Sequence, residues 1–346
     1  MGIVITGASG HLGRSTAELV LDRVPASEVI LTTRHPEALS DFAGRGAKVR
    51  RADFDRPETL PEAFASGERL LLISTDVLGH RAAQHQAAIE AAREAGVRHV
   101  AYTSYLNPVA ENPAVITPSH RDTEKALRES GLAWTALRNA FYAEYQVPAG
   151  AQAIATGRLI HNNGEGRIAY VSREDCAAAA AAVLATEGHE GKAYDITGPE
   201  PLSQGDVAAL LSEVSGRPVE AVAVDDEAFI RGLTAAGVPE PAARGFASYG
   251  RAIREGYIDQ TSDAVADLAG SPPRSLREVR GPPRRTDAGR LRAKGRSPVA
   301  EGTDPDTRSV GRARRSMQEI FRAGCTRPTG GRKVAPPGVP RNGPVR

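Results

Sequence analysis

Three glycines at a regular spacing near the start of the chain could bind a phosphate without a charged side chain. Gly7, Gly10 and Gly13 follow the apolar run 3–5 and precede a helical pattern that continues to Leu21. A helix N-terminus offers unpaired N–H groups and the positive end of the helix dipole. Gly7 would permit the sharp turn, Gly10 would let the backbone approach a pyrophosphate, and Gly13 would let the helix pack closely on the strand.

The spacing of these glycines is Gly-x-x-Gly-x-x-Gly, which differs from the Gly-x-Gly-x-x-Gly of the commonest dinucleotide fingerprint. An ordinary glycine-rich loop is therefore the alternative interpretation. The strand before the loop and the helix after it favour dinucleotide binding. The residues expected to contact the cofactor are Thr6, Gly7, Ala8, Ser9, Gly10, His11 and Leu12.

The end of the second predicted strand bears on the choice of cofactor. A carboxylate there would bind the ribose 2′-hydroxyl of NAD, but this chain has Thr33, Arg34 and His35 instead. A guanidinium is permanently charged and binds phosphate oxygens in pairs. We therefore expect NADP(H) as the cofactor, with Arg34 on its 2′-phosphate, and a solvated surface arginine is the alternative.

The elements that would position these residues alternate regularly along the first part of the chain. Short apolar runs indicate strands at 3–5, 28–33, 47–51, 70–73, 97–103 and 133–137, and helical patterns at 57–64, 79–95 and 119–129 lie between them. Continuous apolar strands alternating with helices predict a parallel sheet covered on both faces. The fold class is therefore α/β, with a Rossmann-type doubly wound sheet in residues 1–139.

Ligands of such sheets bind outside the carboxyl ends of the strands. Polar residues that follow the later strands are therefore candidates for cofactor contacts, although serine also commonly ends a strand. These further candidates are Asp53, Phe54, Ser74, Thr75 and Ser104.

Two more regions follow the predicted nucleotide domain. Residues 140–280 have shorter elements, including helices capped by Ser172 and Ser203, and predict a smaller α/β substrate lobe.

Residues 281–346 carry 16 Lys and Arg against 5 Asp and Glu, whereas the rest of the chain is acidic. This segment is rich in Pro, Gly and Arg, so we expect disorder there. A nucleic-acid-binding arm is the less favoured interpretation, since no aromatic residues interleave with the charges.

Composition excludes several other classes of protein. Two cysteines cannot form a disulfide framework, no apolar stretch is long enough to span a bilayer, and no His and Cys spacing suggests a metal site. Without a leader pattern the chain is expected to be cytoplasmic, as a monomer or homodimer.

Motifs at many strand ends together resemble the NmrA-like, atypical short-chain dehydrogenase/reductase family. The resemblance covers roughly residues 1–280. The motifs are Thr6-Gly7-Ala8-Ser9-Gly10-His11-Leu12-Gly13, Thr33-Arg34-His35-Pro36, Ala52-Asp53-Phe54-Asp55, Leu70-Leu71-Leu72-Ile73-Ser74, Ala101-Tyr102-Thr103-Ser104, His120-Arg121-Asp122-Thr123-Glu124-Lys125 and Leu137-Arg138-Asn139-Ala140-Phe141-Tyr142. The family resemblance implies that Asn139, Tyr142 and Tyr105 line the substrate side of the nicotinamide, and that Lys125 belongs to the catalytic set. Ordinary packing is the alternative for both tyrosines.

One departure from the pattern of typical short-chain dehydrogenases concerns the proton donor. Those enzymes use Tyr-x-x-x-Lys on the fifth helix, but Arg121 stands four residues before Lys125 here. Reduction of a ketone gives a strongly basic alkoxide, whereas reduction of a quinone gives a phenol-like anion with a conjugate-acid pKa near that of tyrosine, about 10. His120 is expected to be a surface or capping residue rather than a proton donor.

These observations favour an NADPH-dependent reductase that transfers a hydride to a small-molecule quinone. The missing tyrosine is also compatible with a second hypothesis, a non-catalytic regulator that senses NADP(H), because the NmrA-like family includes redox-sensing regulators.

Overall fold

Short apolar runs form a central seven-stranded sheet in the computed structural model, which describes residues 1–77 and 79–280. Four of its strands are buried at every position, as expected for a sheet covered on both faces. The strands are β1 (Ile3–Ile5), β2 (Val29–Thr33), β3 (Lys48–Arg51), β4 (Arg69–Leu72), β5 (His99–Tyr105), β6 (Ala133–Asn139) and β9 (Lys192–Ile196). The basic segment 281–346, for which we predict disorder, lies outside the described residues.

The strand order is β3-β2-β1-β4-β5-β6-β9, and every pairing is parallel. The chain moves outward from β1 to β3 and then returns to β4, on the other side of β1. The order therefore reverses between β1 and β4, which places the predicted ligand crevice at their carboxyl ends. The α/β doubly wound sheet expected from the sequence is confirmed.

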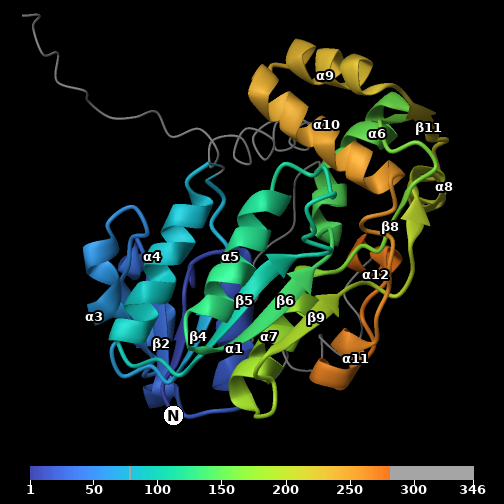
Figure 1. Cartoon of the computed structure of the whole chain (residues 1–346). Coiled ribbons are helices and arrows are strands. Elements are labelled where there is room, and N and C mark those ends of the chain that lie inside the picture. The colour runs from blue at the N-terminus through green and yellow to red at the C-terminus, as the bar shows by residue number, and fades with distance from the viewer. Residues whose placement is uncertain (78, 281–346) are drawn as a thin grey trace, which may run out of the picture.

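Helices cover both faces of this sheet (Figure 1). One face carries α3 (Leu60–Phe64), α4 (Arg81–Glu94) and α5 (Thr117–Glu129), and the other carries α1 (His11–Leu21), α2 (Ser40–Ala43) and α7 (Arg173–Ala185). Each face has its own apolar core. Three short 3-10 helices complete this half of the molecule: η1 (Ala26–Glu28), η2 (Pro36–Leu39) and η3 (Pro57–Thr59); a fourth, η4 (Ala143–Tyr145), follows β6.

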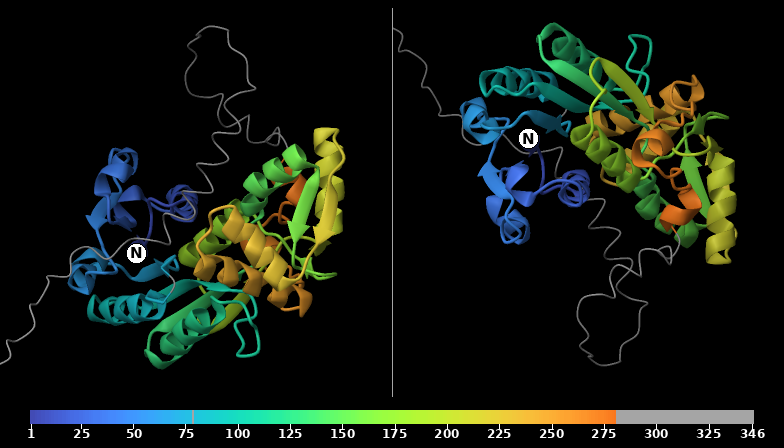
Figure 2. Two further views of the ribbon diagram at one scale, coloured as in Figure 1. Left: turned by 90° about the horizontal axis from the view of Figure 1, so that it is seen from above. Right: turned by 90° about the horizontal axis from the view of Figure 1, so that it is seen from below.

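A second group of elements lies beside the β6 and β9 side of the sheet, toward the carboxyl ends of the strands (Figures 1 and 2). Two small sheets pair β7 (Arg158–His161) with β11 (Glu220–Ala223), and β8 (Arg167–Ile168) with β10 (Leu202–Ser203). The helices of this lobe are α6 (Gln146–Thr156), α8 (Gln204–Ser215), α9 (Asp226–Ala235), α10 (Glu240–Arg254), α11 (Ala264–Ala269) and α12 (Leu276–Arg280). The predicted caps form, since Ser172 and Ser203 each accept a hydrogen bond from a backbone N–H three residues later.

The region expected as one lobe, residues 140–280, contributes two elements to the large sheet. Helix α7 packs on the same face as α1, and β9 pairs with β6 at the edge. No apolar run predicts β9, because its residues are mostly polar and only Ile196 is fully buried. The division at residue 140 stays a prediction, but the lobe beside the sheet is built from two separate stretches, 140–172 and 197–280.

Candidate functional site

The glycine loop has the geometry that a bound phosphate requires. Gly7 adopts a φ of 57°, and a Cβ on Gly13 would lie 2.5 Å from the Gly7 carbonyl oxygen. Helix α1 begins after Gly10 without a side-chain cap, and in the described part of the chain no acceptor takes the N–H groups of His11 or Leu12. The loop therefore offers an open, backbone-lined cradle of the kind that the pyrophosphate of a dinucleotide fits.

Two hydroxyls fix this loop on the strands around it. The Thr6 hydroxyl donates to the Leu71 carbonyl and accepts from the Ile73 N–H, each at 3.0 Å. Ser9 Oγ lies 2.8 Å from Thr33 Oγ1 at the end of β2. These contacts join the carboxyl ends of β1, β2 and β4 into one surface.

Arg34 follows Thr33 on that surface and is exposed. Among residues 1–77 and 79–280 its guanidinium has no ion-pair partner, whereas the nearby Arg14 is held by Asp41 at 2.8 Å. Arg34 therefore remains available to a ligand anion at the end of β2.

The loops after β3 and β4 are held together by side chains of α4. Gln84 donates to Asp55 at 2.7 Å and its oxygen accepts from Thr75 at 2.6 Å. Asp53 and Phe54 are half-buried beside this contact, and the Ser74 N–H donates to Thr103 Oγ1 at 2.8 Å. The predicted cofactor residues of these two loops therefore lie on one connected edge.

Ser104 is placed differently from the other predicted cofactor residues. It lies inside β5, is 4% exposed, and donates to Glu124 of α5 at 2.7 Å. The same carboxylate accepts hydrogen bonds from Arg128 and Arg138. The Ser104 hydroxyl is thus committed to a buried ionic network and is not part of the open crevice.

The three residues predicted for the substrate side come together at the ends of β5 and β6. Tyr105 and Asn139 are register partners on these neighbouring strands. Asn139 Nδ2 donates to Tyr142 Oη at 3.1 Å. Burial raises the pKa of the Tyr105 hydroxyl and of the Tyr142 hydroxyl, so both remain protonated donors at neutral pH.

Unpartnered polar atoms concentrate in the same place. The described residues contain few buried side-chain oxygens without a hydrogen bond, and all of them belong to the ends of β5 and β6, the segment after β6 or the start of α5. They are the oxygens of Tyr105, Thr117, Asn139 and Gln146 (Oε1), together with Glu144 Oε2, which has an ion-pair partner in Arg173 at 3.7 Å. Leaving such a group unsatisfied costs about 1–3 kcal/mol, so this edge retains hydrogen-bonding capacity for a ligand.

An aromatic cluster surrounds these oxygens and includes residues that the sequence analysis did not select. Tyr249 of α10 meets Tyr105 edge to face at 6.5 Å and Phe141 at 5.5 Å, measured between ring centroids. Phe141 also meets Tyr145, whose ring lies beside that of Tyr142. Tyr249 stands more than a hundred residues after β6 in a stretch without a motif, so no local signal identifies it.

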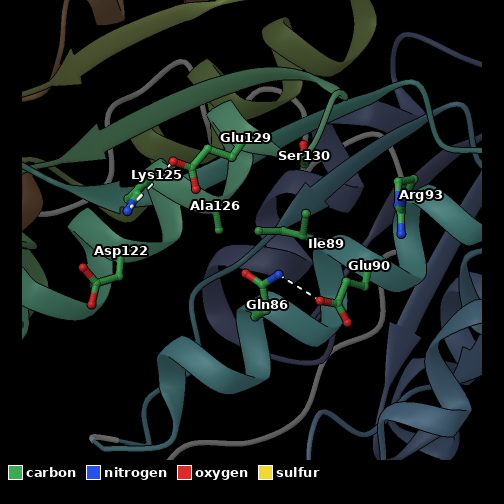
Figure 3. A pocket seen from close by; sticks show the side chains of 9 residues that line it. All are labelled: Gln86, Ile89, Glu90, Arg93, Asp122, Lys125, Ala126, Glu129 and Ser130. Atoms are coloured by element: carbon green, nitrogen blue, oxygen red, sulfur yellow. Dashed lines mark hydrogen bonds and ion pairs between the residues drawn. The ribbon is translucent and has the colours of Figure 1, made fainter.

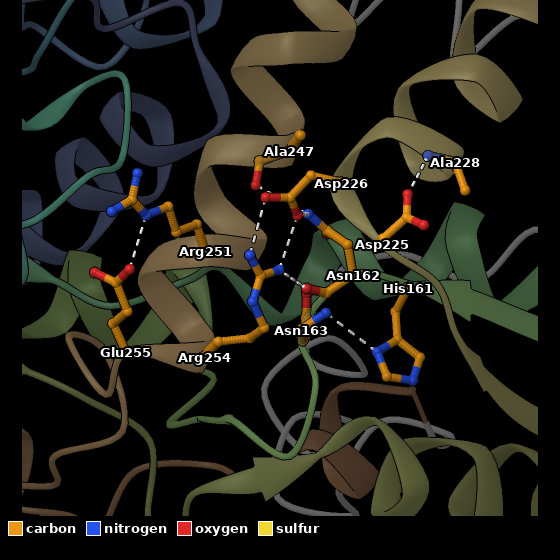
Figure 4. A network of polar contacts seen from close by, with 10 residues as sticks. All are labelled: His161, Asn162, Asn163, Asp225, Asp226, Ala228, Ala247, Arg251, Arg254 and Glu255. Carbon is orange, nitrogen blue, oxygen red and sulfur yellow. Dashed lines mark hydrogen bonds and ion pairs between the residues drawn. The ribbon is translucent and has the colours of Figure 1, made fainter.

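Polar contacts hold α10, and with it Tyr249, in position (Figure 4). Asn162 Nδ2 donates to the Ala247 carbonyl at 2.9 Å and to Asp226 at 2.7 Å, and Arg254 pairs with Asp226 at 2.8 Å. A Cβ on Gly250 would lie 2.0 Å from Asn162 Oδ1. This close fit ties α10 to β7 and α9.

Lys125 does not lie with Asn139 and Tyr142. Its side chain is 69% exposed and points toward Glu129 on the outer side of α5, at 3.9 Å. Figure 3 shows it in a polar groove with Gln86 and Glu90 of α4. The expected catalytic role for Lys125 therefore has no support in its position, and we leave it out of the proposed site.

His120 is not the surface or capping residue that the sequence suggests. It is 4% exposed, its Nδ1 lies 2.7 Å from Tyr102 Oη, and its ring packs 6.0 Å from that of Tyr105. Burial lowers the pKa of the His120 imidazole well below its usual value, so the ring is neutral. The neutral ring of His120 therefore packs against the ring of Tyr105 and helps to hold it in place.

Residues 1–77 and 79–280 contain neither a metal-binding cluster nor a membrane-spanning helix. No group of three or more His, Cys, Asp or Glu side chains is arranged to hold a metal ion. In the same residues, none of the helices has both the length and the apolar character needed to cross a membrane.

Known proteins resemble this chain over most of its length. A family described as NAD(P)H-binding matches residues 7–187. The quinone oxidoreductase 2 of Escherichia coli is 36% identical over 276 residues, which is 80% of this chain and 96% of that protein. The NAD(P)H azoreductase of Xenophilus azovorans is 29% identical over 80% of this chain and 96% of its own length.

Solved structures agree with the sequence relatives. The Escherichia coli NADPH-dependent quinone oxidoreductase in complex with NADPH superimposes with a TM-score of 0.77 at 36% identity, covering 80% of this chain and 98% of that one. A Citrobacter triphenylmethane reductase in complex with NADP(H) gives a TM-score of 0.75 at 37% identity, covering 81% and 99%. The chain therefore belongs to the NAD(P)H-binding family, as its resemblance to NmrA-like proteins implies, and is an NAD(P)H-dependent oxidoreductase.

Proposed function

We propose that this protein is an NADPH-dependent reductase of quinones. One observation carries the proposal: buried oxygens without a hydrogen bond and aromatic rings gather at the ends of β5 and β6 and in the segment that follows β6. A flat conjugated molecule with oxygens at its edges suits such a surface, since rings pack against it and polar groups meet its oxygens. Relatives are named as a quinone oxidoreductase, an azoreductase and a triphenylmethane reductase, and these names all refer to compounds with aromatic or quinonoid rings.

The proposed cofactor contacts follow the carboxyl edge of the sheet. The backbone of the glycine loop, from Gly7 to Leu12, would hold the pyrophosphate, and the loops that contain Asp53 and Thr75 would line the nucleotide. Bound there, NADPH supplies a hydride to the acceptor. The exposed, unpaired Arg34 would bind the 2′-phosphate and select NADPH over NADH.

Asn139, Tyr142 and Tyr105 would orient the acceptor. Asn139 already donates to the Tyr142 oxygen, so the Tyr142 proton is left to hydrogen-bond a substrate oxygen. The raised pKa of both tyrosines keeps them as neutral donors that stabilise charge without losing a proton. A quinol anion needs no stronger acid than this, because solvent can complete its protonation.

Absorbance at the nicotinamide band tests the proposal. Purified protein is mixed with NADPH and either benzoquinone or a naphthoquinone, and the same reactions are run with NADH. We expect rapid oxidation of NADPH in preference to NADH. Tight NADPH binding without oxidation by any soluble quinone would contradict a quinone reductase and would favour the regulator that senses NADP(H).

A further inference from the structure

Arg81, the first residue of α4, is a buried cation close to the proposed site. Its side chain donates to the Thr75 carbonyl through Nε at 2.5 Å, and its Nη1 lies 3.3 Å from Ser119 Oγ and 3.4 Å from His120 Nε2. The residue is 7% exposed. Within the described ranges, no Asp or Glu oxygen lies within ion-pairing distance of it.

Two other arginines that are wholly or partly buried, Arg138 and Arg69, show how the charge of a guanidinium is compensated elsewhere in this fold. Arg138 pairs with the buried carboxylate of Glu124 at 2.9 Å. Arg69, which is 9% exposed, donates to the carbonyls of Leu184 and Thr186 at the C-terminal end of α7, where the helix dipole is negative. Arg81 has only one carbonyl, a hydroxyl and a neutral imidazole. A buried charge without a counter-ion is costly, so its negative partner is expected from a ligand.

The contacts of Arg81 place its charge under the substrate side of the crevice. His120, which accepts from Arg81, packs against Tyr105, and Tyr105 in turn meets Tyr249 of α10. Burial raises the pKa of the Tyr249 hydroxyl, and the positive charge of Arg81 opposes this rise, so the field of Arg81 reaches the aromatic cluster. The glycine loop, by contrast, shares no hydrogen bond with Arg81 among the described residues.

We propose that Arg81 provides the positive charge that stabilises the anion formed when the substrate accepts a hydride. The inference rests on the proposed quinone reduction. A hydride carries two electrons and one hydrogen to the neutral quinone, which becomes a hydroquinone monoanion while the nicotinamide is oxidised. One proton from solvent then completes the hydroquinone. A fixed positive charge near the developing oxyanion lowers the barrier, because it needs no rearrangement during the reaction.

A substituent series of quinones tests the electrostatic role. In Arg81→Gln we expect kcat to fall by about tenfold to a hundredfold with unsubstituted benzoquinone. The loss should be smaller for chlorinated quinones, whose hydroquinones are stronger acids, and larger for methylated ones. Arg81→Lys keeps the charge and should restore most of the rate. A loss that is equal across the series would overturn the proposal.

Gln84→Ala is the matched control for loop position. It removes the acceptor of the Thr75 hydroxyl and the donor to Asp55 but leaves the Arg81 charge in place. We expect it to raise the KM for NADPH without changing the dependence on the quinone substituents. If Gln84→Ala reproduces the Arg81→Gln profile, Arg81 acts only by holding the loop, and the proposal fails.

Binding of para-nitrophenol gives a readout without turnover, since only its phenolate absorbs visible light. We expect the wild-type protein with NADP+ to bind the phenolate in preference to the phenol, and Arg81→Gln to lose this preference. An unchanged phenolate preference together with a raised Kd for NADPH would show that the counter-ion is a cofactor phosphate, and would overturn the proposal. If the wild-type protein oxidises no NADPH with quinones, the proposed function itself fails, which is a different result from an active protein indifferent to Arg81.

Discussion

The cofactor half and the substrate half of the proposed site are built in different ways. The cofactor half is a local turn of backbone, in which Gly7, Gly10 and Gly13 create a cradle within seven residues. The substrate half is assembled from side chains on β5, β6 and α10, which are far apart in the chain. The two halves should therefore tolerate mutation differently. A substitution in the backbone half should abolish cofactor binding, whereas substitutions in the side-chain half should lower activity by amounts that depend on the residue.

The strongest test of the backbone half is Gly13→Ala. The added Cβ would lie 2.5 Å from the Gly7 oxygen and 2.8 Å from Ala8 Cα, so the loop must move. We expect a loss of stability of about 1–3 kcal/mol and loss of measurable NADPH binding by fluorescence titration. Gly232→Ala in α9 is the control, because nothing lies within 4 Å of its Cβ and the helix should gain up to about 1 kcal/mol. Normal NADPH binding by Gly13→Ala would show that the backbone half tolerates substitution, and would contradict the difference between the two halves.

Asn139→Leu tests the side-chain half. It removes the donor to Tyr142 and one of the unpartnered oxygens while keeping a similar volume. We expect kcat/KM for benzoquinone to fall by about a hundredfold. The Kd for NADPH should stay within about twofold of wild type. If Asn139→Leu weakens NADPH binding by the same factor as it lowers kcat/KM for benzoquinone, the two halves do not act separately.

Arg34→Ala should affect only the choice of cofactor. Loss of a charge-assisted contact to phosphate costs about 1.5–3 kcal/mol, so the kcat/KM for NADPH should fall by roughly tenfold to a hundredfold while that for NADH is unchanged. Arg56→Ala, another exposed arginine of the same half, is the control. A preference for NADPH that survives in Arg34→Ala would assign the 2′-phosphate to a different residue.

A pH series examines the buried histidines that lie beneath both halves. Burial lowers the pKa of His85 to about 3, against 6.5 in the unfolded chain. As the pH falls below 6.5 the unfolded state binds a proton that the native state does not, so the free energy of unfolding decreases by up to about 1.4 kcal/mol per pH unit until the pH approaches 3. Urea unfolding of the wild type and His85→Gln should show a shallower dependence in the variant. Parallel curves would contradict this account.

The smallest effect is expected for Tyr249. Tyr249→Phe keeps the ring contacts to Tyr105 and Phe141 and should leave the KM for quinones nearly unchanged. Tyr249→Ala removes them and should raise this KM by about threefold to tenfold, in line with about 1 kcal/mol for an aromatic pair. An unchanged KM in Tyr249→Ala would place the substrate elsewhere on the edge.

The sequence predicts the strands and the glycine turn of the proposed cofactor half, because these signals are local. Alternating apolar runs identify six of the seven strands of the large sheet, and the glycine spacing locates the turn after β1. The edge strand β9 escapes detection, since an edge needs few apolar residues. The surface position expected for His120 is wrong, because which side of α5 faces the core depends on how the whole helix packs, and this packing buries His120. The same packing exposes Lys125, whose catalytic role stays a prediction. Tyr249 reaches the site only through the tertiary fold.

The return of α7 and β9 to the large sheet limits how this protein could be rebuilt. A chain cut after β6 would lack its outermost strand and leave the backbone of β6 unpaired, which invites aggregation. An engineer who wishes to exchange the substrate-facing part must therefore transplant two pieces at once, 140–172 and 197–280, around an invariant insert. The insert consists of residues 173–196. Recombination libraries with crossovers at both ends of this insert should yield folded hybrids, whereas libraries with a single crossover should yield mostly insoluble ones.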